Sequence, residues 1–257
     1  MLIHDGIGPA WVWPVVLGLA GLLIGSFAAT VILRWPEGRS IARVRSACDG
    51  CGRTLKPAEL VPLVSAVISR GRCRSCGMRI DPLHWQVEAG CAIIAIAAGI
   101  VAPGLAGVAG AILGWLLLTL AVLDLRAFWL PDAIVAPLAL LGLAGGVLGL
   151  APDLPDRLWG GLGGRASLWL IAAGYRRWRG RDGLGGGDPK LLGAIGLWLG
   201  WRLLPAVLLC AGLIGLGVVL FRMVQGRAMV RDDALPLGTL MALAAYPAWL
   251  MMVGMAA

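Results

Sequence analysis

The sequence predicts an all-α polytopic membrane protein with about eight transmembrane helices and a small cysteine-containing loop domain. Its 257 residues are 59% hydrophobic and only 14% charged, whereas soluble domains carry about 25% charged residues. The mean hydropathy is +0.86. Long apolar runs alternate with short polar segments, and a helix that spans a bilayer needs about 20 apolar residues. Four of the six cysteines gather in the one polar segment that is long enough to fold separately.

The first apolar run covers residues 11–33 and leads into an Arg-rich stretch instead of a small-residue cleavage site, so we expect a retained span. The polar segment 34–84 follows as a loop domain, and residues 85–257 form a helical core. The core contains seven further apolar runs, at 86–103, 106–123, 132–151, 158–175, 189–201, 203–221 and 236–255. Gly-x-x-x-Gly spacings within these runs indicate close helix packing and nothing further.

Basic residues decide the orientation of these spans. The Lys and Arg residues, 22 in all, cluster at 34–79, at Arg126, at 176–190 and at 222–231, and only Arg157, Arg165 and Arg202 fall outside. Loops rich in Lys and Arg stay in the cytoplasm. Eight spans with the N-terminus outside place all four clusters there, so the net charge of +8 reflects topology and not nucleic-acid binding. Tryptophans at many run boundaries are typical of interfacial anchors.

The loop segment contains two CxxC pairs, Cys48-x2-Cys51 and Cys73-x2-Cys76. Their separation approximates the four-cysteine zinc pattern, so the sequence predicts a zinc knuckle in the cytoplasmic loop. Two Arg-rich hairpins with little apolar core would depend on the metal to fold, because metal binding supplies folding free energy. Two disulfides or free thiols are the alternatives, and a reducing cytoplasm disfavours disulfides. Cys91 and Cys210 lie in apolar runs and are expected to be small buried hydrophobic side chains.

Two aspartates lie at the cytoplasmic edge of predicted spans and are the candidate catalytic residues. Asp124 ends the third apolar run, and Asp188 follows a glycine run just before the sixth. Ionisable residues at membrane spans are costly and therefore indicate function. Two carboxylates in a partly desolvated site cannot both ionise easily, so one keeps its proton and the pair supplies an acid and a base. Such a pair can hydrolyse an amide without a metal or a covalent intermediate.

Helix capping is the alternative role for these side chains. Asp188 precedes Pro189, and an Asp at the N-cap with Pro at the first helical position is a common helix start. The same role suits Asp132 after Pro131. Asp124 is different, because it lies at the C-terminal end of its span, where the helix dipole disfavours an anion.

Other hydrolytic centres find little support in the sequence. His4 and His84 are the only histidines and lie far apart, and neither a GxSxG nor an HExxH motif occurs. The glycines at 185–187 lack the Gly-Lys-Ser/Thr ending of a phosphate-binding loop. Lys190 is therefore expected to face lipid headgroups or a substrate carboxylate.

In combination these features resemble the type IV prepilin peptidases, a family within the GxGD group of intramembrane aspartyl proteases. Four motifs spread over most of the chain carry the resemblance. They are Gly25-Ser26-Phe27 in the first span, the two CxxC pairs, LDLRAFWLPD at 123–132, and the run from Gly185 and Gly187 through Asp188 to Lys190.

The resemblance implies that Asp124 and Asp188 are a catalytic pair, supported by Gly185, Gly187 and Lys190. The pair would cleave after the glycine that precedes the hydrophobic helix of a prepilin or a type II secretion pseudopilin, at the cytoplasmic face of the bacterial inner membrane. The resemblance also implies a structural zinc on the four loop cysteines and methylation of the new N-terminus from S-adenosylmethionine. Position 126 is Arg where many members carry a second acidic residue, which favours Asp124 as the first catalytic group.

Two other classes of protein fit parts of the sequence. One is a zinc-loop membrane transporter whose aspartates carry protons or cations, although transport sites usually lie near the bilayer midplane. The other is a non-proteolytic assembly factor, or a methyltransferase without peptidase activity. Loss of prepilin cleavage on substitution of either aspartate separates the peptidase from both.

Overall fold

The computed structural model of the chain describes residues 9, 11–40, 47–48, 50–226 and 235–256. Some residues of the predicted cytoplasmic clusters lie outside the described residues, as does His4. These basic residues are Arg43, Arg45, Arg227 and Arg231. The regular secondary structure of the described residues is helical, and their extended pairings are two isolated bridges, Ala47 with Thr54 and Arg72 with Arg79.

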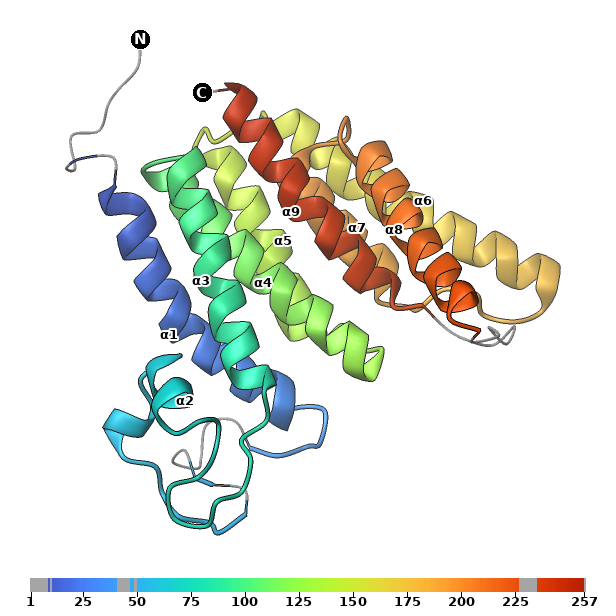
Figure 1. Cartoon of the computed structure of the whole chain (residues 1–257). Coiled ribbons are helices and arrows are strands. Elements are labelled where there is room, and N and C mark those ends of the chain that lie inside the picture. Colours follow the sequence, from blue (N-terminus) through green and yellow to red (C-terminus); the bar gives the residue numbers. More distant parts are fainter. Residues whose placement is uncertain (1–8, 10, 41–46, 49, 227–234, 257) are drawn as a thin grey trace. The chain divides into compact units, whose positions relative to one another are not determined.

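A helix occupies each of the eight apolar runs (Figure 1). These long helices are α1 Val12–Arg34, α3 Leu83–Val101, α4 Leu105–Ala127, α5 Asp132–Val147, α6 Leu154–Arg179, α7 Asp188–Leu199, α8 Leu204–Val224 and α9 Leu237–Ala256. Two short helical segments lie between α1 and α3, namely η1 Pro57–Glu59 and α2 Val64–Ile68. The predicted and observed ends of the long helices agree to within about one helical turn.

Five of the long helices, α1, α3, α4, α8 and α9, are long and apolar enough to cross a membrane. The other three fall short for different reasons. Helix α5 has 16 residues and α7 has 12, whereas a span takes about 20. Helix α6 has 26 residues, but its glycines and charged residues, such as Arg157 and Arg165, lower its hydropathy. The eight-span topology therefore remains a prediction.

The chain forms two compact units, Met1–Thr119 and Leu120–Ala257, and the boundary between them falls within α4. The first unit contains α1, α3 and the cysteine pairs, whereas the second contains α5 to α9 and both candidate aspartates. The predicted division into residues 1–33, 34–84 and 85–257 follows sequence character and not contacts, and it remains a prediction.

Within the first unit, α1 packs closely along α3 (Figure 1). Small residues allow this approach, because a Cβ atom at Gly21 would lie 2.5 Å from the Cys91 carbonyl oxygen, and one at Gly25 would lie 2.6 Å from Glu88 Cα. The buried Glu88 side chain also accepts a 2.8 Å hydrogen bond from the Leu63 N–H, just before α2. Glu88 thereby ties the cysteine-containing segment to α3.

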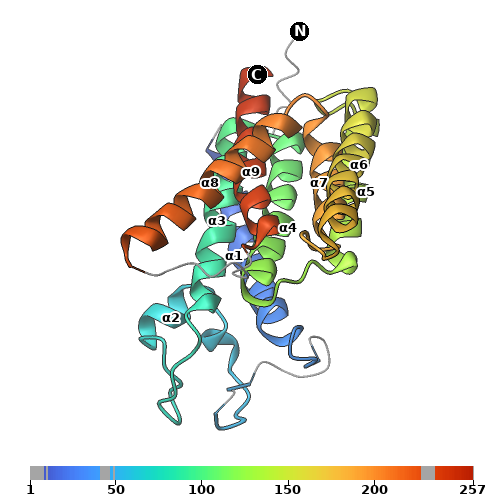
Figure 2. The same cartoon turned by 90° about the vertical axis from the view of Figure 1, so that its right-hand side faces the viewer.

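Within the second unit, α7 packs against both α5 and α6 (Figure 2). Helices α6 and α7 cross where glycines face each other, because a Cβ atom at Gly196 would overlap the Gly160 carbonyl. On the other side of α7, the buried Trp198 indole N–H donates to the Leu138 carbonyl of α5 at 2.7 Å. Helix α7 is therefore enclosed despite its short length, and ten of its twelve residues are buried.

Arg157 links the C-terminal regions of α5 and α7. The side chain is only 2% exposed and donates hydrogen bonds of 2.7–3.0 Å to five backbone carbonyls. These belong to Gly142, Leu150, Ala151, Pro152 and Leu197. Carbonyls at helix C-termini lack partners within the helix, and a cation there complements the helix dipole. Arg157 thus joins the segment that follows α5 to the last turn of α7.

Candidate active site and metal centre

Asp124 lies in the last turn of α4 and is held by the first turn of α9. Its side chain is 5% exposed, and Oδ2 accepts a 2.8 Å hydrogen bond from the Thr239 N–H. The Thr239 hydroxyl donates to the Ala121 carbonyl at 2.7 Å and lies 3.3 Å from the same Asp124 oxygen. N–H groups in the first turn of a helix lack partners within the helix, and the dipole there favours an anion. The N-terminus of α9 therefore compensates for the unfavourable position of Asp124 at the end of α4.

Asp188 is the first residue of α7 and is 7% exposed. Its Oδ2 accepts a 3.0 Å hydrogen bond from the N–H of Gly185, which precedes the helix. The N-cap position itself belongs to Gly187, without a side-chain hydrogen bond to the helix. The simple N-cap role for Asp188 is therefore wrong, although the side chain does stabilise the turn by which α7 begins.

The side chain of Leu130 lies between the two aspartate segments. A Cβ atom added at Gly187 would lie 2.8 Å from Leu130 Cβ, and one added at Gly238 would lie 3.0 Å from Leu130 Cδ1 and 2.9 Å from Asp124 Oδ2. Glycines at these two positions let the Asp188 and Asp124 segments approach a common side chain. The structure thus brings the segments of both aspartates against one side chain.

Lys190 lies two residues after Asp188 in the first turn of α7, but its side chain bonds to a different carboxylate. Its Nζ donates to both oxygens of Asp132, at 2.7 and 2.8 Å. Asp132 is the first residue of α5 and follows Pro131 at the N-cap, so it does not occupy the cap position itself. The ion pair joins the start of α5 to the start of α7, a role that differs from the expected contact of Lys190 with headgroups or substrate.

Sequence reasoning missed Thr239, Gly238 and Leu130. Thr239 lies 115 residues after Asp124, and no spacing in the sequence relates the two. The available signal is weak: Pro236 and Gly238 punctuate the start of the last apolar run. Leu130 belongs to the first aspartate motif. Because it is an apolar residue in an apolar segment, the sequence does not indicate that its side chain lies between the two aspartate segments.

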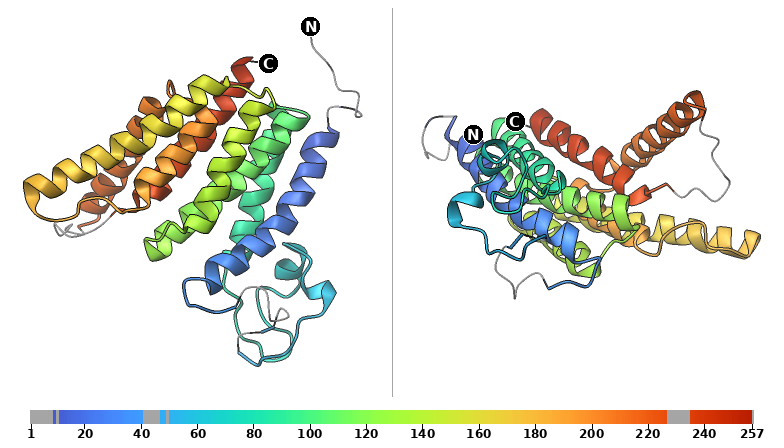
Figure 3. Two further views of the ribbon diagram at one scale, coloured as in Figure 1. Left: turned by 180° about the vertical axis from the view of Figure 1, so that it is seen from behind. Right: turned by 60° about the horizontal axis from the view of Figure 1, so that its bottom comes forward.

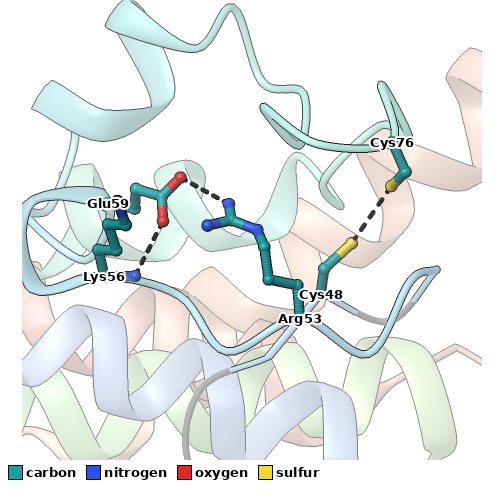
Figure 4. A network of polar contacts seen from close by, with 5 residues as sticks. All are labelled: Cys48, Arg53, Lys56, Glu59 and Cys76. Atoms are coloured by element: carbon teal, nitrogen blue, oxygen red, sulfur yellow. Dashed lines mark hydrogen bonds and ion pairs between the residues drawn. The ribbon is translucent and has the colours of Figure 1, made fainter.

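The four loop cysteines of the first unit lie close enough together to bind a metal ion. Their sulfur atoms are within 4.8 Å of one another, and the sulfurs of Cys48 and Cys76 are 3.7 Å apart (Figure 4). Tetrahedral zinc with Zn–S bonds of about 2.3 Å requires sulfur separations of about 3.8 Å. All six cysteines are free, and the separation of Cys48 and Cys76 is longer than the bond of a disulfide, which is about 2.05 Å.

Each cysteine pair lies in a turn of the same construction. The N–H of Gly52 donates to the Cys48 carbonyl, and the N–H of Gly77 donates to the Cys73 carbonyl, both at 2.9 Å. The two glycines adopt φ values of +67° and +72°, a conformation that glycine adopts without strain. A glycine after each pair therefore allows the backbone to turn back toward the sulfurs.

Backbone and side-chain donors surround the sulfurs. The N–H groups of Cys76 and Ser75 lower the pKa of the Cys73 thiol to about 6, which favours the thiolate that metals bind. Arg53, beside the same sulfur, donates to Glu59 at 2.7 Å (Figure 4). This bond and the one from the Lys56 N–H lower the pKa of Glu59 to about 2. The ion pair between Arg53 and Glu59 therefore stabilises the segment between the two cysteine turns.

The two remaining cysteines differ from each other. Cys91 is fully buried in α3, as expected, and its carbonyl accepts a 2.9 Å hydrogen bond from the Trp115 indole. Cys210 is exposed on α8, so the expectation that it is buried is wrong. Neither belongs to the group of four that could hold a metal.

Two family models match different parts of the chain. The model described as the bacterial peptidase A24 N-terminal domain matches residues 19–101, which include the four loop cysteines. The model described as the type IV leader peptidase family matches residues 111–220, which include Asp124 and Asp188. No solved structure matches the chain.

Curated relatives match over most of their length. A protein of Aeromonas hydrophila named prepilin leader peptidase/N-methyltransferase is 34% identical over 251 residues, covering 86% of this chain and 87% of the relative. Proteins of the same name from Pseudomonas aeruginosa and Klebsiella pneumoniae are 34% and 36% identical, covering 90% and 78% of this chain and 88% and 91% of the relatives. The chain therefore belongs to the type IV leader peptidase family, among the enzymes named prepilin leader peptidase/N-methyltransferase, as its motifs predicted.

Proposed function

We propose that the protein is an aspartyl endopeptidase that removes the leader from type IV prepilins or type II secretion pseudopilins, with Asp124 and Asp188 as the catalytic pair. One observation carries the assignment. Two carboxylates from separate helices are each less than 8% exposed, and the segments that carry and contact them meet at the side chain of Leu130. Buried acidic pairs of this kind are costly to a fold and are found at functional sites.

The two carboxylates divide the proton transfers of amide hydrolysis between them. The ionised carboxylate takes a proton from water as the water oxygen bonds to the scissile carbonyl carbon. The protonated carboxyl donates a hydrogen bond to the carbonyl oxygen, where negative charge develops. The carbon–nitrogen bond then breaks and the leaving nitrogen takes up a proton, giving a leader with a free carboxyl group and a pilin with a free amine.

We further propose that the chain spans the bacterial inner membrane eight times with its N-terminus outside. Helices in all eight apolar runs support this topology, as do the clustered basic residues, including Arg176, Arg177 and Arg179 in the last turn of α6. Both aspartates then lie at the cytoplasmic edge of the membrane. A prepilin leader is short and basic and precedes an apolar helix, so its cleavage site would lie at the same level.

Zinc is the metal that best fits the four loop cysteines. Four thiolates leave no open coordination position, so the ion would have a structural role in the loop domain. The spacing of Cys48 and Cys76 at 3.7 Å suits tetrahedral coordination. Cys48, Cys51, Cys73 and Cys76 would hold the ion, and it takes no part in the amide hydrolysis.

A second activity is proposed for the same chain, because its relatives carry the name N-methyltransferase. The new N-terminal amine would attack the methyl carbon of S-adenosylmethionine, which leaves as the neutral thioether while the nitrogen loses a proton. Gly25-Ser26-Phe27 and the cysteine loop support this activity through their resemblance to bifunctional members.

Co-expression with a prepilin tests both activities. Wild type, Asp124→Asn and Asp188→Asn would be compared by gel shift for leader removal and by N-terminal mass for methylation. We expect wild type to trim the leader and add one methyl group, and each variant to leave the leader intact. Asp153→Asn, an exposed aspartate before α6, is the matched control and should cleave normally.

Membrane insertion and thermal unfolding of each variant would accompany the assay, so that loss of cleavage is not loss of folding. Cleavage by a well-folded Asp124→Asn or Asp188→Asn variant would refute the aspartyl mechanism. Absence of leader removal by wild type would favour a non-proteolytic assembly factor. Trimming without methylation would leave the peptidase assignment intact and remove the second activity.

A further inference from the structure

A cavity of about 390 Å³ lies beside the glycine run that precedes Asp188. One wall is a single face of α6, and the other is formed by the segment 182–190. The α6 residues that line it are Arg165, Trp169, Ala172 and Arg176. Their spacing of four, three and four residues places them on the same face of the helix. The C-terminal part of α6 extends beyond α7 (Figure 3), so this face continues past the enclosed core of the second unit.

The cavity is cationic, and one of its charges is uncompensated. Arg176 pairs with Asp182 at 3.4 Å, and Lys190 pairs with Asp132 at 2.7 Å. Among the residues that the structure describes, Arg165 has no side-chain hydrogen bond or ion pair. An unpaired charge in a helix at membrane depth is costly unless it faces a cavity and meets a counter-charge. The cavity therefore suits an anionic ligand.

The remaining lining is apolar. Trp169, Ala172, Leu184 and Pro189 border the same space, and the Trp169 side chain is 58% exposed. Helix α6 also exposes apolar side chains next to this face, at Leu170 and Ile171. A ligand that complements the whole cavity therefore carries a negative charge at one end and hydrocarbon at the other.

We propose that this cavity binds an anionic phospholipid, with the headgroup phosphate between Arg165 and Arg176 and the first part of an acyl chain against Trp169. Basic pockets between helices on the cytoplasmic side of membrane proteins suit such headgroups, and tryptophan rings lie at the level of the headgroups. A free phosphate ion would use the cations but gain nothing from the apolar wall. Charge and apolar lining together favour the lipid.

Lipid binding to the full-length protein in detergent tests this site. Protein stripped of native lipid would be titrated with phosphatidylglycerol, with zwitterionic phosphatidylcholine and with inorganic phosphate, and the bound species counted by native mass spectrometry. We expect saturable binding of phosphatidylglycerol that Arg165→Gln weakens about fivefold and Arg165→Gln with Arg176→Gln weakens by more than tenfold. Phosphatidylcholine should bind several-fold more weakly to wild type.

Two further variants keep the test specific. Arg177→Gln removes the same charge from an exposed neighbour outside the cavity and should bind phosphatidylglycerol as wild type does. Ala172→Phe fills the cavity without changing charge and should abolish saturable binding, provided that its lipid-free thermal unfolding matches wild type.

Three results would overturn the assignment. Equal losses in Arg165→Gln and Arg177→Gln would mean nonspecific attraction to surface charge. Unchanged binding in the double variant would place the lipid elsewhere. Inorganic phosphate that binds as tightly as phosphatidylglycerol would identify the cavity as a site for a small water-soluble anion.

Discussion

The orientation of Asp124 depends on two residues at the start of α9. The Thr239 N–H fixes one carboxylate oxygen, and Gly238 leaves room for it, since a Cβ atom there would lie 2.9 Å from that oxygen. Neither residue carries a charge or belongs to a motif that the sequence singled out. The catalytic candidates could be chosen from sequence because carboxylates at membrane edges are rare, but their supports are common residue types that only position distinguishes.

Substitution of Thr239 tests its role as a positioning residue. Thr239→Val keeps the backbone donor and the side-chain shape but removes the hydroxyl near Asp124, so we expect prepilin cleavage to slow by about tenfold. Thr239→Ser restores the hydroxyl and should recover most of the rate. Initial rates of leader removal by purified protein would measure both, and equal rates in the valine and serine variants would contradict a role for the hydroxyl.

Gly238→Ala should have a larger effect than the loss of the hydroxyl. The added methyl group would displace the Asp124 carboxylate, and a misplacement of about 1 Å can cost a hundredfold in rate. Gly212→Ala on α8 is the matched control, because a Cβ atom there meets no atom within 4 Å. Leader cleavage should fall about a hundredfold in the first variant and stay unchanged in the second. Normal cleavage by Gly238→Ala would place the reactive carboxylate elsewhere.

Short helix α7 owes its stability to its neighbours. A helix of 12 residues is marginal in isolation, but α7 is enclosed by glycine-mediated contact with α6, by Trp198 against α5 and by Arg157 at its C-terminal region. This enclosure positions Asp188 at the N-terminus of α7. The sequence predicted the helix from its apolar run, and the Gly-x-x-x-Gly spacings predicted close packing without identifying the partner helix.

Removal of the buried Arg157 side chain should destabilise the second unit. Arg157→Met leaves five carbonyls without their donor, for which we expect a loss of about 3 kcal/mol in the free energy of unfolding. Thermal unfolding in detergent would measure it. Arg202→Met is the control, because that side chain is 73% exposed, and it should change the free energy of unfolding by less than about 0.5 kcal/mol. Similar stabilities of the two variants would contradict the bridging role.

Contact between α6 and α7 should fail when a side chain is added at the crossing. Gly196→Ala places a methyl group against the Gly160 carbonyl and forces the helices apart. We expect a destabilisation of about 1–3 kcal/mol, typical of overpacking, together with reduced leader cleavage as α7 shifts. Gly174→Ala on α6, where a Cβ atom meets no neighbour within 4 Å, should retain the stability and activity of wild type.

At the scale of the whole molecule, the candidate metal site and the candidate catalytic site belong to different compact units. The cysteine pairs belong to the unit Met1–Thr119 and the aspartates to the unit Leu120–Ala257. The loop has few apolar contacts of its own and is held by the Arg53–Glu59 ion pair and the bond between Glu88 and Leu63. A bound metal would supply much of its folding free energy, whereas the aspartate unit has a buried helical core.

Metal removal should therefore act on the loop alone. With a strong chelator, we expect the four loop cysteines to become reactive toward a thiol reagent while Cys91, which is fully buried, stays protected. Because protons compete with the metal for thiolates, retention should be complete near neutral pH and should fall as the pH is lowered. Mass spectrometry of labelled protein with and without added zinc would measure this. Labelling that is insensitive to both chelator and zinc would rule out a metal at these cysteines.

Four features could be predicted from the sequence: the helical membrane character, the positions of the long helices, the four-cysteine cluster and the choice of Asp124 and Asp188. Each depends on local composition or on short spacings, which survive in any arrangement of the helices. Three other features needed the three-dimensional fold: Asp124 contacts Thr239 across 115 residues, Lys190 contacts Asp132 across 58, and α7 is enclosed by α5 and α6. They could not be predicted, because many arrangements of apolar helices satisfy the same hydrophobic pattern. Contacts at particular glycines, Arg157 and Trp198 select among them, and local periodicity does not encode which helices meet.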